Sequence, residues 1–124
     1  MSTSRTVRLT RNFERNLGEI EVFLVEAGAP AAFGALLDAL IDALIPNLER
    51  FPKLGSDFLG RRPGSAEGLG RWDLLKSRVG DREIREYLLG DFLVLYLESK
   101  SGIDLLAIRH HGQLSYDLQS HWPR

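Results

Sequence analysis

The residues best suited to chemistry lie near the end of the chain, in the stretch IRHHGQLSYDL at 108–118. This stretch contains the adjacent residues His110 and His111, followed by Tyr116. Histidine can accept or donate a proton near neutral pH, because its ordinary pKa is about 6.5. Arg85 adds a guanidinium group, which can hold a phosphate through two parallel N–H bonds. These four residues are therefore candidates for proton transfer and phosphate binding.

A structural role is the alternative for the same residues. Arg85 could pair with a neighbouring glutamate such as Glu83 or Glu98, and the histidines could hold the end of the strand in place.

A second candidate is a concentration of positive charge in residues 61–85, in a chain whose net charge is −1. Such a segment could bind nucleic acid or an acidic partner, or it could be an ordinary solvated loop. Its glycines do not precede a Gly-Lys-Ser/Thr sequence, so we interpret them as turn formers rather than as a phosphate-binding loop. The candidate binding residues are Arg61, Arg62, Arg71, Lys76 and Arg78.

Two other kinds of site are disfavoured. A structural zinc site is not expected, because adjacent histidines on a strand point to opposite faces and His121 lies further along the chain. A nucleophile at Ser115 is not expected either, because no strand–turn–helix pattern surrounds it. We therefore predict no metal and no cofactor.

Length and composition favour one domain, covering 1–124, with a long loop at about 53–81. Hydrophobic residues make up 44% of the chain, which is enough for an ordinary core. The sequence has no cysteine, which excludes disulfides and thiol catalysis and is typical of a reducing cytoplasm. The apolar stretches are interrupted by charge or proline, and the first residues show no cleavage pattern, so we expect no membrane span and no leader.

Hydrophobic periodicity predicts two helices after a short strand at 6–10. The first helix follows Thr10 or Asn12 as its N-cap and stops at Gly28; the second begins at Pro30 and is closed by Pro52. Pro46 should kink the second helix or end it early. The short joint between the helices predicts an antiparallel hairpin. Its core-facing residues are predicted to be Phe13, Leu17, Ile20, Phe33, Leu37, Leu40 and Leu44.

Three further strands are predicted at 82–89, 91–98 and 102–110. The second of these is apolar on both faces and should be central, and the short steps between the strands indicate hairpins. The predicted fold is therefore α+β: an N-terminal strand and an antiparallel helical hairpin packed on a mainly antiparallel four-stranded sheet. The hairpin should pack on strands 92–97 and 103–108.

This order of elements resembles the RelE/ParE superfamily, the toxins of bacterial type II toxin–antitoxin pairs. The resemblance is carried by VRLTRNFERNLGEIEVFL, LERFPKLG, IREYLLGDFLVLYL and IDLLAIRHHGQLSYD, which cover nearly the whole chain except about 57–80. It implies a cytoplasmic toxin domain of the kind associated with plasmid stabilisation, held inactive by a cognate antitoxin whose extended segment wraps it.

The resemblance leaves the mechanism open. RelE-like members cleave messenger RNA on the ribosome, and ParE-like members inhibit DNA gyrase without known covalent chemistry. Arg85 and Tyr116 match an arginine and a tyrosine of the nucleases, and His110 or His111 could move the proton. However, Phe92 and Leu93 replace a Tyr-Arg pair of the nucleases, and Gly112 stands where they usually have an arginine. An enzyme, a gyrase-binding toxin and a non-toxic interaction module of the same fold all remain possible at this point.

Overall fold

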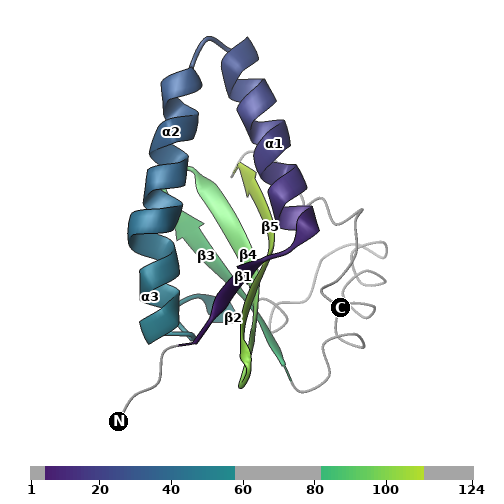
Figure 1. The fold of residues 1–124 in the computed structure, drawn as a ribbon, viewed down its shortest axis with the longest axis vertical. Helices are drawn as coiled ribbons and strands as arrows, with labels where there is room; N and C mark the ends of the chain where they lie inside the picture. The colour runs from purple at the N-terminus through teal and green to yellow at the C-terminus, as the bar shows by residue number, and fades with distance from the viewer. Residues whose placement is uncertain (1–4, 58–81, 111–124) are drawn as a thin grey trace.

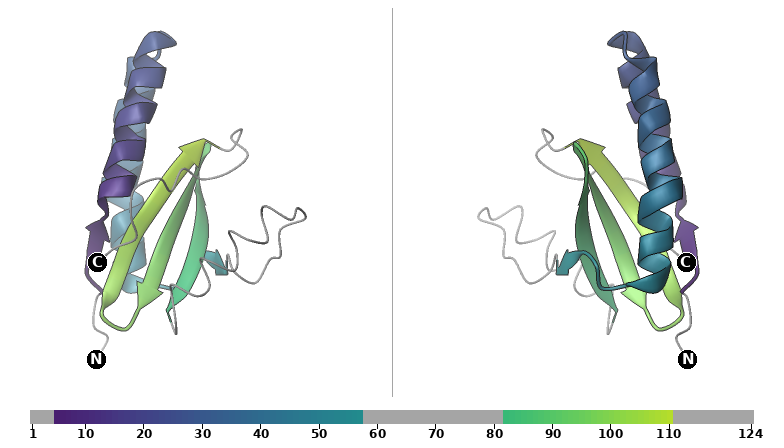
Figure 2. Two further views of the ribbon diagram at one scale, coloured as in Figure 1. Left: turned by 90° about the vertical axis from the view of Figure 1, so that its right-hand side faces the viewer. Right: turned by 90° about the vertical axis from the view of Figure 1, so that its left-hand side faces the viewer.

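The chain folds into two layers, a helical hairpin and a sheet (Figure 1). The structure is a computed structural model, and it describes residues 5–57 and 82–110. Figure 2 shows that the hairpin covers one side of the sheet and that its tip extends beyond the sheet. The predicted α+β class is therefore confirmed. The helices are α1 (Arg11–Glu26), α2 (Pro30–Ala39), the π-helical turn η1 (Leu40–Leu44) and α3 (Ile45–Arg50); the strands are β1 (Val7–Leu9), β2 (Ser56–Asp57), β3 (Glu83–Leu89), β4 (Phe92–Ser99) and β5 (Gly102–His110).

The ends of the helices follow the local chemistry of the sequence. Thr10 is the N-cap of α1, and its hydroxyl oxygen accepts a hydrogen bond from the backbone N–H of Phe13. Gly28 follows α1 with φ of 76°, a conformation that glycine adopts without a steric cost. Pro30 then begins α2, where its missing N–H is not needed. The prediction of an antiparallel hairpin with these boundaries is confirmed.

Pro46 does not end the second helix, so of the two predicted outcomes, a kink or an early end, the early end is wrong. The helix continues to Arg50 through η1, in which the Ile45 N–H donates to the carbonyl of Leu40, five residues earlier. A proline inside an α-helix lacks one N–H and crowds the carbonyl four residues before it. The wider π-helical turn just before Pro46 relieves both problems, which is why the chain does not stop there.

The sheet has five strands in the order β1-β5-β4-β3-β2, one strand more than predicted. The extra strand, β2, lies in the segment predicted to be a loop and pairs only with Arg85 and Glu86 of β3. Two residues are too few to show an alternating pattern, so this strand could not be predicted from hydrophobic periodicity. β1 is parallel to β5, and the other pairings are antiparallel. β4 lies at the centre, as predicted.

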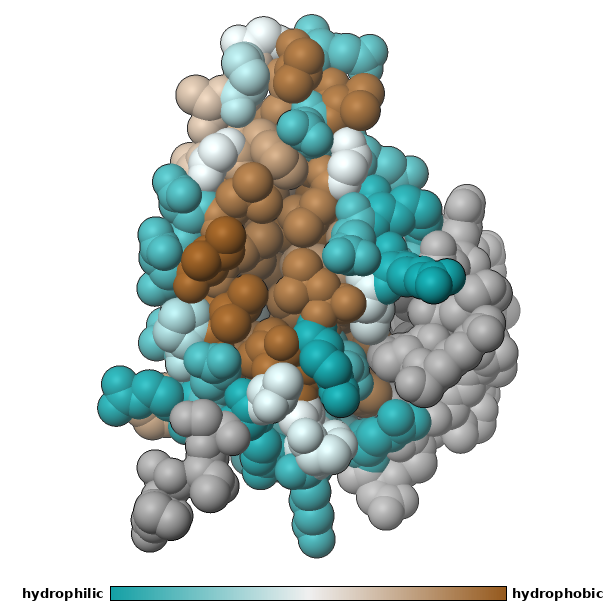
Figure 3. All heavy atoms as spheres, in the orientation of Figure 1, coloured by the Kyte–Doolittle hydropathy of each residue, from teal (hydrophilic) through white to brown (hydrophobic). Residues whose placement is uncertain are grey.

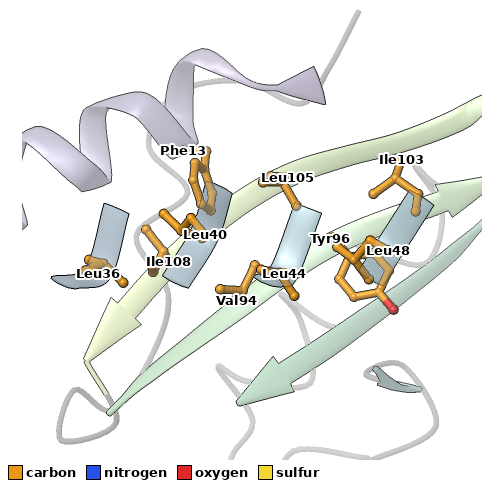
Figure 4. Packing of buried hydrophobic residues seen from close by; sticks show 10 residues of the cluster. All are labelled: Phe13, Leu36, Leu40, Leu44, Leu48, Val94, Tyr96, Ile103, Leu105 and Ile108. Carbon is orange, nitrogen blue, oxygen red and sulfur yellow. The ribbon is translucent and has the colours of Figure 1, made fainter. Parts of the chain in front are cut away.

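The core lies between the hairpin and the sheet (Figure 4). Phe13, Leu40 and Leu44 are buried against Val94 and Leu105 of the two central strands, which confirms the predicted packing. Four other predicted core residues are partly buried against this cluster: Leu17, Ile20, Phe33 and Leu37. The rest of the buried cluster consists of Leu36 and Leu48 from the helices and, from the two strands predicted to receive the hairpin, Val94, Tyr96, Ile103, Leu105 and Ile108.

The first turns of α1 are attached to an irregularity in β5. The register of β4 and β5 shifts between Leu95 and Tyr96, so that Leu106 has no partner in the ladder. The side-chain amide of the buried Asn12 donates to the Leu106 carbonyl at 2.9 Å, and the Asn16 side-chain oxygen accepts from the Ile108 N–H at 3.2 Å. Thr10 donates to the neighbouring Leu105 carbonyl at 2.8 Å. These polar side chains fix the helix on the sheet by satisfying backbone groups at the bulge.

Candidate functional site

Two of the predicted site residues, Arg85 and His110, lie within the described part of the chain. Arg85 is in β3, opposite Tyr96 of β4 and Asp57 of β2. His110 is the last residue of β5, opposite Phe92. The others lie outside the described residues: His111, Tyr116, Arg61, Arg62, Arg71, Lys76 and Arg78.

The guanidinium of Arg85 is engaged by the protein itself. One terminal nitrogen donates to the Gly55 carbonyl at 2.7 Å, and the other donates to the Glu83 carboxylate at 2.8 Å. The side chain is only 14% exposed. The alternative role that the sequence left open, an ion pair with a neighbouring glutamate, is therefore confirmed for Glu83. In this arrangement Arg85 joins β3 to the segment that leads into β2.

His110 lies at the opposite end of the sheet and is exposed. Its ring meets the ring of Phe92 edge-on, with centroids 5.6 Å apart and an interplanar angle of 88°. Such an edge-to-face contact orients both rings and stabilises the end of the strand pair. The imidazole is thus placed where a partner or substrate could reach it.

The structure does not bring Arg85 and His110 together. Their partners on β4, Tyr96 and Phe92, are four residues apart, which corresponds to about 13 Å along a strand. β3 and β5 also flank β4 on opposite sides, which adds roughly 9.5 Å across the sheet. A single phosphate therefore cannot contact both side chains while Arg85 keeps its present partners.

A network of ion pairs surrounds Arg85 and holds the segment between α3 and β2. Lys53 pairs with Glu83 at 2.6 Å and with the buried Glu98 at 3.0 Å. Arg5 pairs with the same Glu98 at 3.0 Å and so adds the start of the chain to the network. From the sequence, Glu98 is predicted only as a possible partner of Arg85, and no pattern indicates its pairs with Lys53 and Arg5.

Tyr96 fixes the same segment from inside the core. It is fully buried, its hydroxyl donates to the Pro52 carbonyl at 2.9 Å, and it accepts from the Gly55 N–H at 2.8 Å. A side chain at Gly55 would lie only 2.7 Å from the Glu86 carbonyl, so this close approach requires glycine. Burial raises the pKa of Tyr96, which keeps the hydroxyl protonated and able to donate.

Glu83 makes the stability of this network depend on pH. The hydrogen bond from Lys53 holds the pKa of the Glu83 carboxyl below its ordinary value of 4.5. A lowered pKa in the folded state contributes stability above the unfolded value, and this contribution is lost as the pH falls through the folded value. We expect Glu83→Gln to lose less stability than the wild type when the pH is lowered below about 4.5, as measured by urea denaturation.

The matched control for this prediction is Glu21→Gln, which removes an exposed carboxylate on α1, outside the network. This variant should keep the wild-type dependence on pH. Identical acid profiles for the wild type and Glu83→Gln would contradict the role given to Glu83.

The outer side of the hairpin is strongly apolar (Figure 3). Large exposed side chains of the hairpin are Val22, Phe23, Val25 and Ile41. The continuous helix Pro30–Arg50 is long and apolar enough to cross a membrane, by length and composition alone. This is weak evidence for a membrane span, because one face of that helix is packed on the sheet.

Among residues 5–57 and 82–110, no group of three or more His, Asp or Glu residues could hold a metal ion.

A sheet covered on one face by a helical hairpin, with its N-terminal strand parallel to its last strand, defines a RelE/ParE-like α+β domain. Comparison with known families agrees: residues 7–115 match the family described as "ParE toxin of type II toxin-antitoxin system, parDE". The chain therefore belongs to the ParE toxin family, within the RelE/ParE superfamily. A search of curated proteins finds no match. Membership makes the protein a toxin-family component of a type II system and implies an antitoxin partner.

Proposed function

We propose that this protein inhibits growth by binding DNA gyrase, and that its antitoxin neutralises it in the cytoplasm. The observation that carries the proposal is the family match over residues 7–115, because the resemblance associates ParE-like toxins with gyrase. In this proposal the exposed polar end of β5, including His110, is a contact surface. His111 and Tyr116, which follow it in the sequence, would extend that surface.

The state of Arg85 supports binding rather than RNA cleavage. A nuclease needs a cation that is available to the scissile phosphate. Arg85 instead uses both terminal nitrogens on Gly55 and Glu83, and it lies far from His110 along the sheet. The net charge of −1 also gives little of the electrostatic attraction to RNA that a ribosome-directed toxin would gain from excess positive charge.

The test is to add the purified chain to a gyrase supercoiling assay and, separately, to a translating extract. We expect loss of supercoiling with translation intact, and recovery of supercoiling when the cognate antitoxin is added. Blocked translation with active gyrase would overturn the proposal in favour of the nuclease. Normal activity in both assays would favour a non-toxic interaction module.

A further inference from the structure

The second face of the sheet, by which we mean the side that faces away from the hairpin, carries a row of apolar side chains. Successive side chains of a strand point to opposite faces. Val94 and Tyr96 of β4 belong to the cluster under the hairpin, so Leu95 and Leu97 point to the second face. The hairpin lies on the other side of the sheet, as Figure 2 shows, and therefore does not bury these two leucines.

This apolar row extends over three strands and is fully buried. Leu95 is paired with Ala107 of β5, and Leu97 is paired with Ile84 of β3. All four side chains are fully buried. A sheet face in contact with water usually carries polar side chains at such positions. Because the helices described in 5–57 lie on the opposite side, residues outside the described ranges bury this face.

The burial is a property of the single chain, so it requires neither a second copy nor a partner protein. Two segments outside the described ranges, 58–81 and 111–124, contain several large apolar residues. Residues 1–4 contain only one, Met1. The segment that buries the second face is therefore either 58–81 or 111–124.

The degree of burial changes along the second face and favours 58–81. Ile84 lies next to the start of β3, which 58–81 precedes, and it is fully buried. At the other end of the face, where β5 ends at His110, Leu93 is only partly buried and Leu88 is 60% exposed. A segment that leaves the sheet at His110 would bury Leu93 and Leu88 before it reached Ile84. The observed order is the reverse.

The sequence of 58–81 also suits this position. Trp72, Leu75 and Val79 recur at spacings of three and four, which predicts that they share one side of a short helix. The two ends of the segment adjoin β2 and β3, which are paired with each other at one edge of the sheet. From β3 to β5 is roughly 9.5 Å across the sheet, the length of about seven helical residues.

We propose that residues 58–81 form a third layer, packed on the second face of the sheet through Trp72, Leu75 and Val79. Charge alone suggests other roles for this segment: a binding site for nucleic acid or an acidic partner, or a solvated loop. The proposal goes beyond the proposed function, because it removes the buried part of the second face from the surface available to gyrase.

The test uses the absence of cysteine from the chain. Ala107→Cys introduces a single thiol on the second face, and its reaction with the thiol reagent DTNB is followed by absorbance under native conditions. We expect slow reaction in this single-cysteine chain. Adding Trp72→Ser and Leu75→Ser should raise the rate by about tenfold or more, because the reagent reaches a buried thiol only through opening of the structure. The matched control adds Leu114→Ser and Leu118→Ser in 111–124 instead, and should leave the reaction slow.

A second thiol distinguishes local uncovering from general unfolding. Val94→Cys lies under the hairpin, where Val94 is fully buried, and should stay slow when Trp72→Ser and Leu75→Ser are added. A further measurement needs no change in the proposed layer. Trp122→Phe leaves Trp72 as the only tryptophan of the chain. Its emission should lie at the shorter wavelengths of a packed indole and resist quenching by acrylamide.

Several results would overturn the proposal. Fast reaction of Ala107→Cys alone, or the emission of a solvent-exposed Trp72, would show that 58–81 does not pack on the second face. A faster reaction caused by the Leu114 and Leu118 changes but not by those at Trp72 and Leu75 would assign the face to 111–124. A rate that rises on dilution would assign it to a second copy.

Equal acceleration at Ala107→Cys and Val94→Cys would also count against the proposal, because it would give Trp72 and Leu75 no particular relation to the second face. None of these measurements involves gyrase. The proposal can therefore fail while the proposed function stands, and the reverse also holds.

Discussion

Replacing Leu40 by alanine is expected to lower the free energy of unfolding by about 2–5 kcal/mol. Leu40 is 3% exposed and lies in the cluster between the hairpin and the sheet, with Phe13 and Ile108 beside it in Figure 4. Its removal leaves a cavity that close-packed neighbours fill only in part, so the loss includes both transfer and cavity contributions. Urea denaturation followed by circular dichroism measures it.

The neighbouring residue provides the matched control. Ile41 is 61% exposed on the same helix, so Ile41→Ala should change stability by no more than about 0.5 kcal/mol. Leu95→Ala tests the sheet independently, because Leu95 is fully buried in β4. Near-wild-type stability for both Leu40→Ala and Leu95→Ala would contradict the fold.

Features that depend on a few consecutive residues could be predicted from the sequence. Thr10 caps α1, Gly28 follows it with a positive φ, and Pro30 begins α2, each for a local steric or hydrogen-bonding reason. The apolar character of β4 on both faces also indicated its central position, because only a strand covered on both sides needs it. Local pattern and tertiary structure agree at these points.

Features that depend on long-range contacts could not be predicted in the same way. Lys53 and Glu98 are 45 residues apart in the sequence, and Arg5 and Glu98 are 93 apart. Nothing in the types or spacing of charged residues selects these pairs from the many others that the composition permits. The response to Pro46 was also unpredictable, because a π-helical turn leaves no periodic signal in five residues.

The exposed apolar side chains of the hairpin show how an apolar pattern can be misread. Phe23 lies three positions after Ile20 and Ile41 one position after Leu40, both of which are predicted to face the core, yet Phe23 and Ile41 are exposed. The hairpin tip extends past the sheet, as Figure 2 shows, so some of these positions have no sheet to cover them. Periodicity predicts which side of a helix is apolar, but the extent of the neighbouring layer decides whether that side is buried.

The types of residue in the candidate site could be predicted from the sequence, but the distances between these residues could not. Arg85 was expected to be available to a phosphate or paired with a glutamate, and the structure shows the pair. Its second partner, the Gly55 carbonyl, comes from a segment 30 residues earlier and has no signature in the sequence. The separation of Arg85 from His110 follows from strand register, which is set by the whole sheet.

Arg85→Ala is expected to lower the free energy of unfolding by about 3 kcal/mol. A hydrogen bond to a charged group contributes about 1.5–3 kcal/mol. Arg85 makes two such bonds, and its side chain is mostly shielded from water. Arg85→Lys keeps the charge without the planar fork, so its loss should be smaller. Arg11→Ala, at an exposed arginine on α1, is the control and should be close to neutral. A catalytic arginine would behave differently: its removal would abolish growth inhibition and leave the unfolding curve unchanged. If Arg85→Ala keeps the wild-type stability but loses toxicity, the nuclease hypothesis is restored. If it is destabilised as expected, Arg85 belongs to the framework that holds the start of β2 on the sheet.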